Sequence, residues 1–139
     1  MSELRVRFAE TDQMGVAHHG AFVAWLEVGR VEWLRERGYA YSELEAGGVS
    51  LAVADLQLRY RQSARFDDVL GIETRLVAAG SRGCSFAYRV VRSADGSLLA
   101  DARTSHIAVD RSGRTVRLPD AWLRFLRGCL PPGDAPGRC

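Results

Sequence analysis

The chain has 139 residues, of which 47% are hydrophobic and 26% are charged, and its formal net charge is +2. These values are typical of one soluble globular domain, and the small charge gives no argument for a nucleic-acid partner. No run of about 18 apolar residues is present, and the N-terminal sequence MSELRVRFAE lacks the layout of a signal peptide. We therefore expect a cytoplasmic protein without a membrane span.

The N-terminal part of the chain predicts one strand and two helices. Residues 4–9 alternate apolar and polar side chains, as a half-buried strand does. Residues 20–37 repeat apolar side chains at helical spacing, which predicts a largely buried helix that ends at Gly38. Residues 42–47 predict a short helix followed by two glycines.

From residue 49 the apolar period changes to two, which is typical of strands. Four long strands are predicted, at residues 49–66, 69–80, 83–96 and 97–110. Asp95-Gly96 is a hairpin signal between the last two strands. Residues 119–128 begin with proline and predict a short amphipathic helix. The tail 129–139 is rich in proline and glycine and is predicted to be disordered.

This order of elements predicts an α+β fold in one domain, residues 1–128. Strands joined by short turns pair antiparallel, and one buried helix then needs one curved sheet around it. No further helix is predicted to cover the other face of the sheet. We therefore expect a dimer or tetramer, which would cover that face or extend a sheet edge.

The loop FAETDQMGVAHHG, residues 8–20, carries the polar side chains that suit catalysis. It precedes the long predicted helix, whose N-terminus offers free N–H groups and positive potential. Gly15 lets backbone approach a ligand, so this region could polarise a carbonyl as an oxyanion hole does. Asp12 could attack that carbonyl or activate water, and His19 could orient or move a proton. The alternative is that Asp12 only caps a turn.

A metal site is not expected. His18 and His19 are adjacent in sequence, so their side chains point apart, and no second cluster of residues supplies more ligands. His106 stands alone in a predicted strand, and the three cysteines fit no zinc spacing. All 19 basic residues are arginine, which reflects genome composition but also offers forked guanidinium groups that suit phosphate.

Three segments resemble one known family. TDQMGVAHHGAFVAWLEVGRVEWLRERG resembles the first loop and central helix of the acyl-CoA thioesterases with the hotdog fold. The most similar group is the 4-hydroxybenzoyl-CoA thioesterase-like family, with its Tol-Pal-associated branch. ARFDDVLGIETRL and HIAVDRSGRTVRLP resemble a strand entry and the last strand of that family. Over roughly residues 4–127, this implies a curved antiparallel sheet around a long central helix, a homodimer or homotetramer, and hydrolysis of an acyl-CoA.

The resemblance also implies roles for single residues. Asp12 falls on the catalytic aspartate, Gly15 on the glycine whose N–H faces the thioester, and His19 on an assisting histidine. The residues implied to bind substrate are His18, Phe22, Glu27, Ser81, Arg82, Gly83, Arg114 and Arg117. The departures are that only Arg82 is basic in its loop, and that the two histidines replace aromatic residues, which argues against 4-hydroxybenzoyl-CoA itself. CoA is part of the substrate, and no other cofactor is expected.

Several alternatives stay open at this point. Glu27 could only pair with Arg30, and Arg114 and Arg117 could be solvated turn residues. For the whole protein, one alternative is a hotdog hydroxyacyl dehydratase, in which His19 pairs with an acid to abstract a proton. The other is a non-catalytic acyl-CoA-binding protein.

Overall fold

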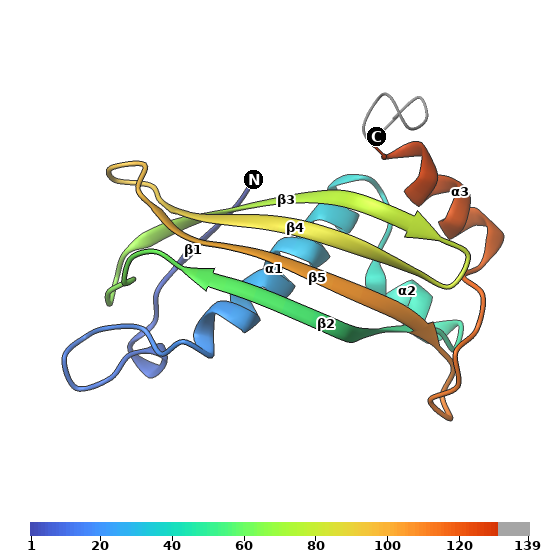
Figure 1. Ribbon diagram of the computed structural model, residues 1–139, viewed down its shortest axis with the longest axis horizontal. Helices are drawn as coiled ribbons and strands as arrows, with labels where there is room; N and C mark the ends of the chain where they lie inside the picture. Colours follow the sequence, from blue (N-terminus) through green and yellow to red (C-terminus); the bar gives the residue numbers. More distant parts are fainter. Residues whose placement is uncertain (131–139) are drawn as a thin grey trace. The chain divides into compact units, whose positions relative to one another are not determined.

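The computed structural model describes residues 1–130, so most of the predicted tail, 131–139, lies outside the described residues. Within that range no helix is both long and apolar enough to cross a bilayer. The elements in chain order (Figure 1) are β1 (Ser2–Arg5), the 3-10 helix η1 (Phe8–Glu10), α1 (Ala21–Glu36), α2 (Tyr41–Ala46), β2 (Ser50–Tyr60), β3 (Val69–Gly80), β4 (Gly83–Arg92), β5 (Leu98–Val109) and α3 (Asp120–Gly128).

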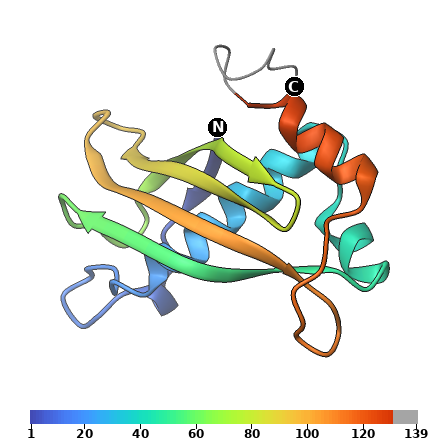
Figure 2. The same cartoon turned by 45° about the vertical axis from the view of Figure 1, so that its right-hand side comes forward.

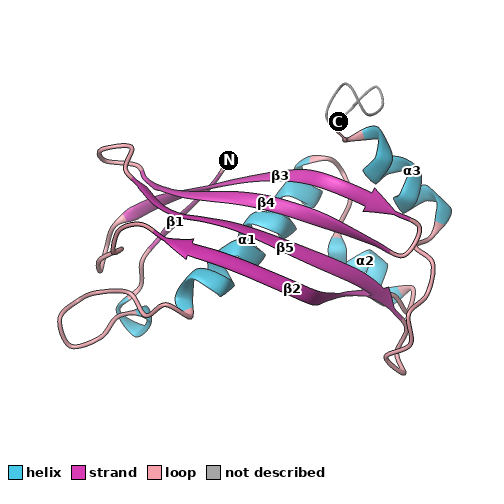
Figure 3. Cartoon of the chain, in the orientation of Figure 1, coloured by secondary structure: helices cyan, strands magenta, loops and turns pink. Residues whose placement is uncertain are grey.

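The strands of the described chain form one five-stranded sheet with the order β1-β3-β4-β5-β2. β1 pairs antiparallel with β3, with Leu4 opposite Leu70. The arrows of β3, β4 and β5 alternate in direction because tight turns join them (Figure 3). β1 and β2 are the edge strands. The predicted α+β class with an antiparallel sheet is confirmed.

The long predicted helix is confirmed almost to the residue. α1 spans Ala21–Glu36, and Gly38 ends it with a φ of +85°, a backbone conformation that favours glycine. The predicted strand at 69–80 coincides with β3. The hairpin signal is also correct, because Gly96 has a φ of +72° and the Arg92 N–H donates to the Ser97 carbonyl at 2.9 Å.

Three strand predictions were too long, and the one at 83–96 ends at Arg92, where the hairpin turn begins. The strand predicted at 4–9 ends at Arg5, because the Glu10 carboxylate accepts the Arg7 N–H at 2.8 Å and bends the chain into η1. Phe8 is therefore 75% exposed instead of facing the core with Val6. The strand predicted at 49–66 ends at Tyr60. Directly after it, the Leu99 carbonyl accepts the N–H groups of both Arg61 and Gln62, so the regular pairing with β5 stops there.

The chain divides into two compact units, each made of segments that are distant in sequence. Unit 1 contains Met1–Trp33, Leu58–Thr74 and Tyr88–Ala102. Its core includes the buried side chains of Phe22, Trp25, Leu26, Leu70, Ile72 and Leu99. All the residues of the pocket described below belong to this unit.

Unit 2 contains Leu34–Gln57, Arg75–Ala87 and the residues from Arg103 onward. In this unit the chain leaves β5 through a turn and enters α3 (Figure 2). The ring of Tyr39 stacks on Phe125 at 3.8 Å and meets the edge of Trp122 at 5.1 Å. α3 therefore contributes its apolar face to the core of this unit.

Within unit 1, α1 approaches β3 so closely that one position must be glycine. A Cβ atom on Gly29 would lie 2.5 Å from Thr74 Oγ1 and 2.7 Å from Ile72 Cγ2. Both neighbours are β-branched and held in a strand, so their side chains have little freedom to move away. The close approach of helix and sheet therefore depends on the missing side chain of Gly29.

Gly29→Ala is expected to destabilise the protein. Alanine gains about 1 kcal/mol of helix propensity, but overpacking against a stiff strand costs typically about 1–3 kcal/mol. We expect a net loss of about 1 kcal/mol in the free energy of unfolding, measured by urea denaturation. Gly20→Ala is the control, because a Cβ there meets nothing within 4 Å. A more stable Gly29→Ala protein would contradict the prediction.

Candidate active site

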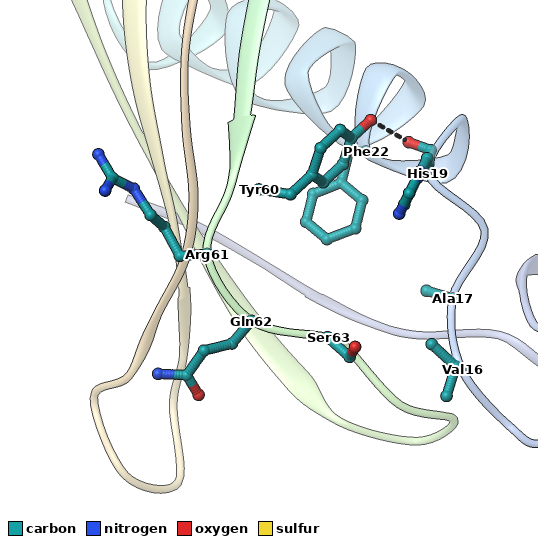
Figure 4. A pocket seen from close by; sticks show the side chains of 8 residues that line it. All are labelled: Val16, Ala17, His19, Phe22, Tyr60, Arg61, Gln62 and Ser63. Carbon is teal, nitrogen blue, oxygen red and sulfur yellow. Dashed lines mark hydrogen bonds between the residues drawn. The ribbon is translucent and has the colours of Figure 1, made fainter.

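A pocket of about 180 Å³ opens where the segment before α1 meets the end of β2 (Figure 4). The loop side contributes backbone and small side chains, the first turn of α1 contributes Phe22, and the strand side contributes four consecutive residues. The lining residues are Val16, Ala17, His19, Phe22, Tyr60, Arg61, Gln62 and Ser63. Two of the residues predicted from the sequence, His19 and Phe22, therefore share one pocket.

His19 stands at the entrance of α1 and is held by Tyr60. The Tyr60 hydroxyl donates to the His19 carbonyl at 2.9 Å, and the two rings stack with centroids 4.3 Å apart (Figure 4). The N–H groups of His19 and Gly20 have no acceptor among the described residues. They lie at the positive end of the α1 dipole, so a carbonyl oxygen in the pocket would find donors there.

Asp12 folds its own loop into a tight turn. One carboxylate oxygen, Oδ1, accepts the N–H of Met14 at 2.8 Å and that of Val16 at 3.1 Å. The Asp12 N–H donates to the Val16 carbonyl, and the Gly15 N–H donates to the Asp12 carbonyl. The turn-capping interpretation of Asp12 is thus correct as far as Oδ1 is concerned, while Oδ2 has no donor among the described residues.

The turn also fixes the charge of Asp12. Backbone hydrogen bonds from Val16 and Met14 lower the pKa of this carboxyl, and the nearby His18 adds to the effect. Asp12 is exposed and does not line the pocket itself. Its link to the pocket is Val16, whose N–H it binds and which forms part of the lining.

Gly15 has a different environment from the one that the resemblance implies. Its φ of +74° explains why glycine stands there, since the turn needs a left-handed residue. Its N–H donates to the Asp12 carbonyl at 3.0 Å, and it lies six residues before the first residue of α1. The role of the Gly15 N–H toward the thioester stays a prediction.

The same turn occurs a second time in the chain, at Asp110. Its Oδ1 accepts the N–H groups of Ser112 and Arg114, and the Gly113 N–H donates to the Asp110 carbonyl. Hydrogen bonds from the Ser112 hydroxyl and the Arg114 N–H lower the pKa of Asp110 as well. An aspartate three residues before a glycine therefore encodes a turn, and its neighbours decide whether it does chemistry.

Sequence reasoning missed the role of Glu10 in holding the site together. Its carboxylate accepts the Trp25 indole N–H at 3.0 Å and the Arg7 backbone N–H at 2.8 Å. Burial alone would raise the pKa of Glu10, but the hydrogen bonds from Arg7 and Trp25 outweigh it and lower the pKa. The Glu10 carbonyl also accepts the His18 N–H at 2.8 Å. Glu10 thus ties the loop to α1.

The remaining predicted residues of unit 1 lie outside the pocket. His18 is exposed on the loop, and its charge interaction with Asp12 helps to lower the pKa of that carboxyl. Glu27 is exposed on α1, and no ion pair joins it to Arg30 among the described residues. Arg30 instead donates to the Tyr88 hydroxyl at 3.3 Å. Glu27 does not line the pocket described above, and its role toward the acyl group stays a prediction.

The predicted nucleotide-binding residues all fall in unit 2, where the backbone brings two of their segments together. The Leu118 N–H donates to the Ser81 carbonyl at 2.9 Å, and the Ala108 N–H donates to the Arg82 carbonyl at 2.8 Å. Gly83 has no room for a side chain, because a Cβ there would collide with the His106 carbonyl. The exposed residues Arg82, Arg114 and Arg117 are thus carried by neighbouring turns of one unit.

The strand side of the pocket was also missed. Tyr60, Arg61, Gln62 and Ser63 line the pocket, but the sequence analysis placed this stretch in a continuous strand. The available signal was the run of three polar residues, Arg61, Gln62 and Ser63, after Tyr60. That signal marks the end of a strand but does not show what the chain meets there.

Comparisons with known proteins agree with this geometry. The acyl-CoA thioester hydrolase YbgC of Escherichia coli O6:H1 is 33% identical over 107 residues, which cover 77% of this chain and 79% of YbgC. A hypothetical protein from Thermus thermophilus has a crystal structure with a TM-score of 0.82 and 40% identity, covering 91% of this chain and 98% of that one. The DHNA-CoA thioesterase from Staphylococcus aureus has a TM-score of 0.80 at 27% identity, covering 84% and 78%.

The family model of the Thioesterase-like superfamily matches residues 6–126, which is most of the chain. The match confirms the hotdog fold and the expected enzyme class, a thioester hydrolase. Membership of the Tol-Pal-associated branch stays a prediction. The pocket at the start of α1, the sheet order and these similarities lead to one conclusion: the chain belongs to the thioesterase-like superfamily of hotdog-fold acyl-CoA thioesterases.

Proposed function

We propose that the protein hydrolyses a small acyl-CoA thioester, short-chain or aromatic, to the free acid and CoA. The observation that carries this proposal is the pocket at the start of α1, which joins His19 and Phe22 to a loop with an ionised carboxylate. Its volume of about 180 Å³ is below the usual range of pockets for drug-sized ligands. A small acyl group fits this size better than a long chain does.

In the proposed reaction, the backbone N–H groups at the start of α1 hold the thioester oxygen. Negative charge develops on that oxygen in the transition state, and fixed donors at a helix N-terminus stabilise it. His19 assists by hydrogen bonding from the pocket wall. The Gly15 N–H already donates to the Asp12 carbonyl. To bind the same oxyanion, it must share its hydrogen between these two acceptors.

Asp12 is proposed to supply the carboxylate in one of two ways. As a nucleophile, it forms an anhydride with the acyl carbon while the C–S bond breaks, and water then hydrolyses the anhydride. As a general base, it takes a proton from water, whose oxygen attacks the carbon while CoA thiolate leaves. Single-turnover hydrolysis in oxygen-18 water detects the first route, because label enters Asp12 only when water attacks the aspartyl carbon of an anhydride.

The proposed reaction uses no metal and no bound cofactor, because a thioester carbonyl is already electrophilic. CoA enters as part of the substrate. We also propose that the turns of unit 2 bind the CoA phosphates, with Arg82, Arg114 and Arg117 as the charged groups and Ser81 and Gly83 as backbone neighbours. Arg82 has no ion-pair partner among the described residues, and Arg117 lies 4.0 Å from Asp120.

The assembly is proposed to be a homodimer or homotetramer, in the cytoplasm. The edge strand β2 supports this proposal, since it pairs only with β5 in the described sheet and its residues Val53 and Leu56 expose 52% and 40% of their surface. Long apolar edges of this kind are usually covered in the native state.

Asp12→Asn should lose most of the turnover and keep the fold. Asparagine retains an Oδ1 acceptor for Met14 and Val16, so the turn persists while the charge is lost. We expect kcat to fall by about a hundredfold or more, measured by thiol release from a panel of short-chain and aromatic acyl-CoAs.

Asp110→Asn is the matched control, because Asp110 makes the same turn outside the pocket. Its kcat should stay within about twofold of the wild type, as is usual for a surface change that keeps its acceptor. An unchanged kcat in Asp12→Asn would remove Asp12 from the mechanism. Hydration of crotonyl-CoA without thiol release would support a dehydratase, and tight binding without turnover would support a non-catalytic protein.

The pH dependence of Asp12 has a definite sign. Its pKa is lowered in the folded protein, so the active carboxylate persists as pH falls and is lost only below the ordinary aspartate value of about 3.9. In His19→Gln, which removes the imidazole from the pocket wall, kcat/KM should be constant between pH 5 and 8. An acid limb with a midpoint above pH 5 in that variant would contradict an ionised Asp12.

Arg82→Ala and Arg117→Ala should each raise KM for an acyl-CoA by about three- to tenfold, since each removes one partly screened charge contact with phosphate. The same acyl group on N-acetylcysteamine, which lacks the phosphates, should show no change. Arg124→Ala, an exposed arginine on α3, is the control. Equal effects on both substrates would show that the arginines do not act on phosphate.

A further inference from the structure

Tyr60 is the last residue of β2 and forms part of the pocket wall. The resemblance to the thioesterase family gives it no role, and sequence patterning places it only on one face of a strand. In the structure, 40% of its surface is exposed, although its ring touches two residues of the site. An aromatic residue at such a half-open position is not explained by core packing alone.

Tyr60 contacts both the main chain and the side chain of His19. Its hydroxyl donates to the His19 carbonyl at 2.9 Å, while its ring lies against the imidazole at 4.3 Å with an interplanar angle of 27° (Figure 4). The first contact fixes the backbone of His19, and the second limits the rotamers of its side chain. Tyr60 therefore restrains both the backbone and the ring of His19.

The same contact also joins the strand to the helix. The His19 carbonyl accepts the Phe22 N–H at 3.2 Å, so the Tyr60 hydroxyl shares an acceptor with the first turn that leads into α1. The Phe22 ring meets the Tyr60 ring edge-on at 5.1 Å. Tyr60 thus orders the N–H groups of His19 and Gly20 together with the imidazole.

We propose that Tyr60 is a positioning residue for catalysis, which holds His19 and the start of α1 in the arrangement that faces the thioester carbonyl. This inference rests on the proposed function. Phenylalanine at this position keeps the ring contacts and loses only the bond to the carbonyl, whereas leucine loses both. The two contributions can therefore be measured separately.

The kinetic test is a double-mutant cycle between positions 60 and 19. Tyr60→Phe should lower kcat by about fivefold, as expected for one hydrogen bond, with KM within about twofold of the wild type. Tyr60→Leu should lower kcat by about thirtyfold, since the aromatic contact is also lost. In a His19→Ala background, Tyr60→Leu should lower kcat by only about fivefold, because alanine keeps the main-chain carbonyl that accepts the Tyr60 hydroxyl but has no imidazole for the ring to hold.

A spectroscopic readout tests the contact without activity. In a proton–carbon correlation NMR spectrum, the ring protons of His19 should lose the ring-current shift of the stacked aromatic ring in Tyr60→Leu and keep it in Tyr60→Phe. Tyr41→Phe is the matched control, because the Tyr41 hydroxyl makes a bond of the same length, 2.9 Å, to the Leu51 N–H in unit 2. That variant should keep both the kcat and the His19 resonances of the wild type.

Two results would overturn the proposal. One is an equal loss of kcat from Tyr60→Leu with and without His19, and the other is a His19 resonance that Tyr60→Leu does not move. Failure of the proposed function looks different, since the wild type would then release no thiol from any acyl-CoA. In that case the NMR comparison still decides whether Tyr60 holds His19.

Discussion

The geometry of the site depends on one carboxylate oxygen, Oδ1 of Asp12, which accepts two backbone N–H groups of its own loop. The turn that it closes brings Thr11 opposite Ala17 and leaves the following backbone free to bind a second segment. The Ala17 N–H donates to the Ala64 carbonyl, and the Phe66 N–H donates to the Gly15 carbonyl. The loop side of the pocket is therefore built by backbone hydrogen bonds that all require this turn.

The turn made by Asp12 occurs again at Asp110, so the turn by itself does not indicate a catalytic residue. Both aspartates cap the same backbone shape, and in both cases the donated hydrogen bonds lower the pKa of the carboxyl. What differs is the surroundings: Asp12 is joined through Val16 to a pocket with His19 and Phe22. A short motif can thus specify a local conformation in two places, while function depends on which elements the conformation meets.

The two compact units hold different parts of the proposed substrate-binding machinery. Unit 1 carries the pocket and Asp12, which is proposed to be the catalytic carboxylate, and unit 2 carries the exposed arginines that are proposed to bind phosphate. Glu10 and Gly29 show how unit 1 is held together: Glu10 ties the loop to Trp25, and Gly29 allows α1 to lie close on β3. These contacts hold α1 against the loop and the sheet within this unit.

The sequence by itself determined the elements with strong periodicity, since burial of one face leaves its pattern in the residues. This pattern predicted α1, β3 and the turns at Gly38 and Gly96. The sequence also showed that Asp12 precedes the helix, and its motifs indicated the family. Only the tertiary structure decided that β1 ends at Arg5, that the Gly15 N–H is occupied within the turn, and that Tyr60 holds His19. Each of these depends on a partner that the local pattern does not encode, because a hydrogen bond or ring contact between segments 41 residues apart, as between Tyr60 and His19, exists only after the chain has folded.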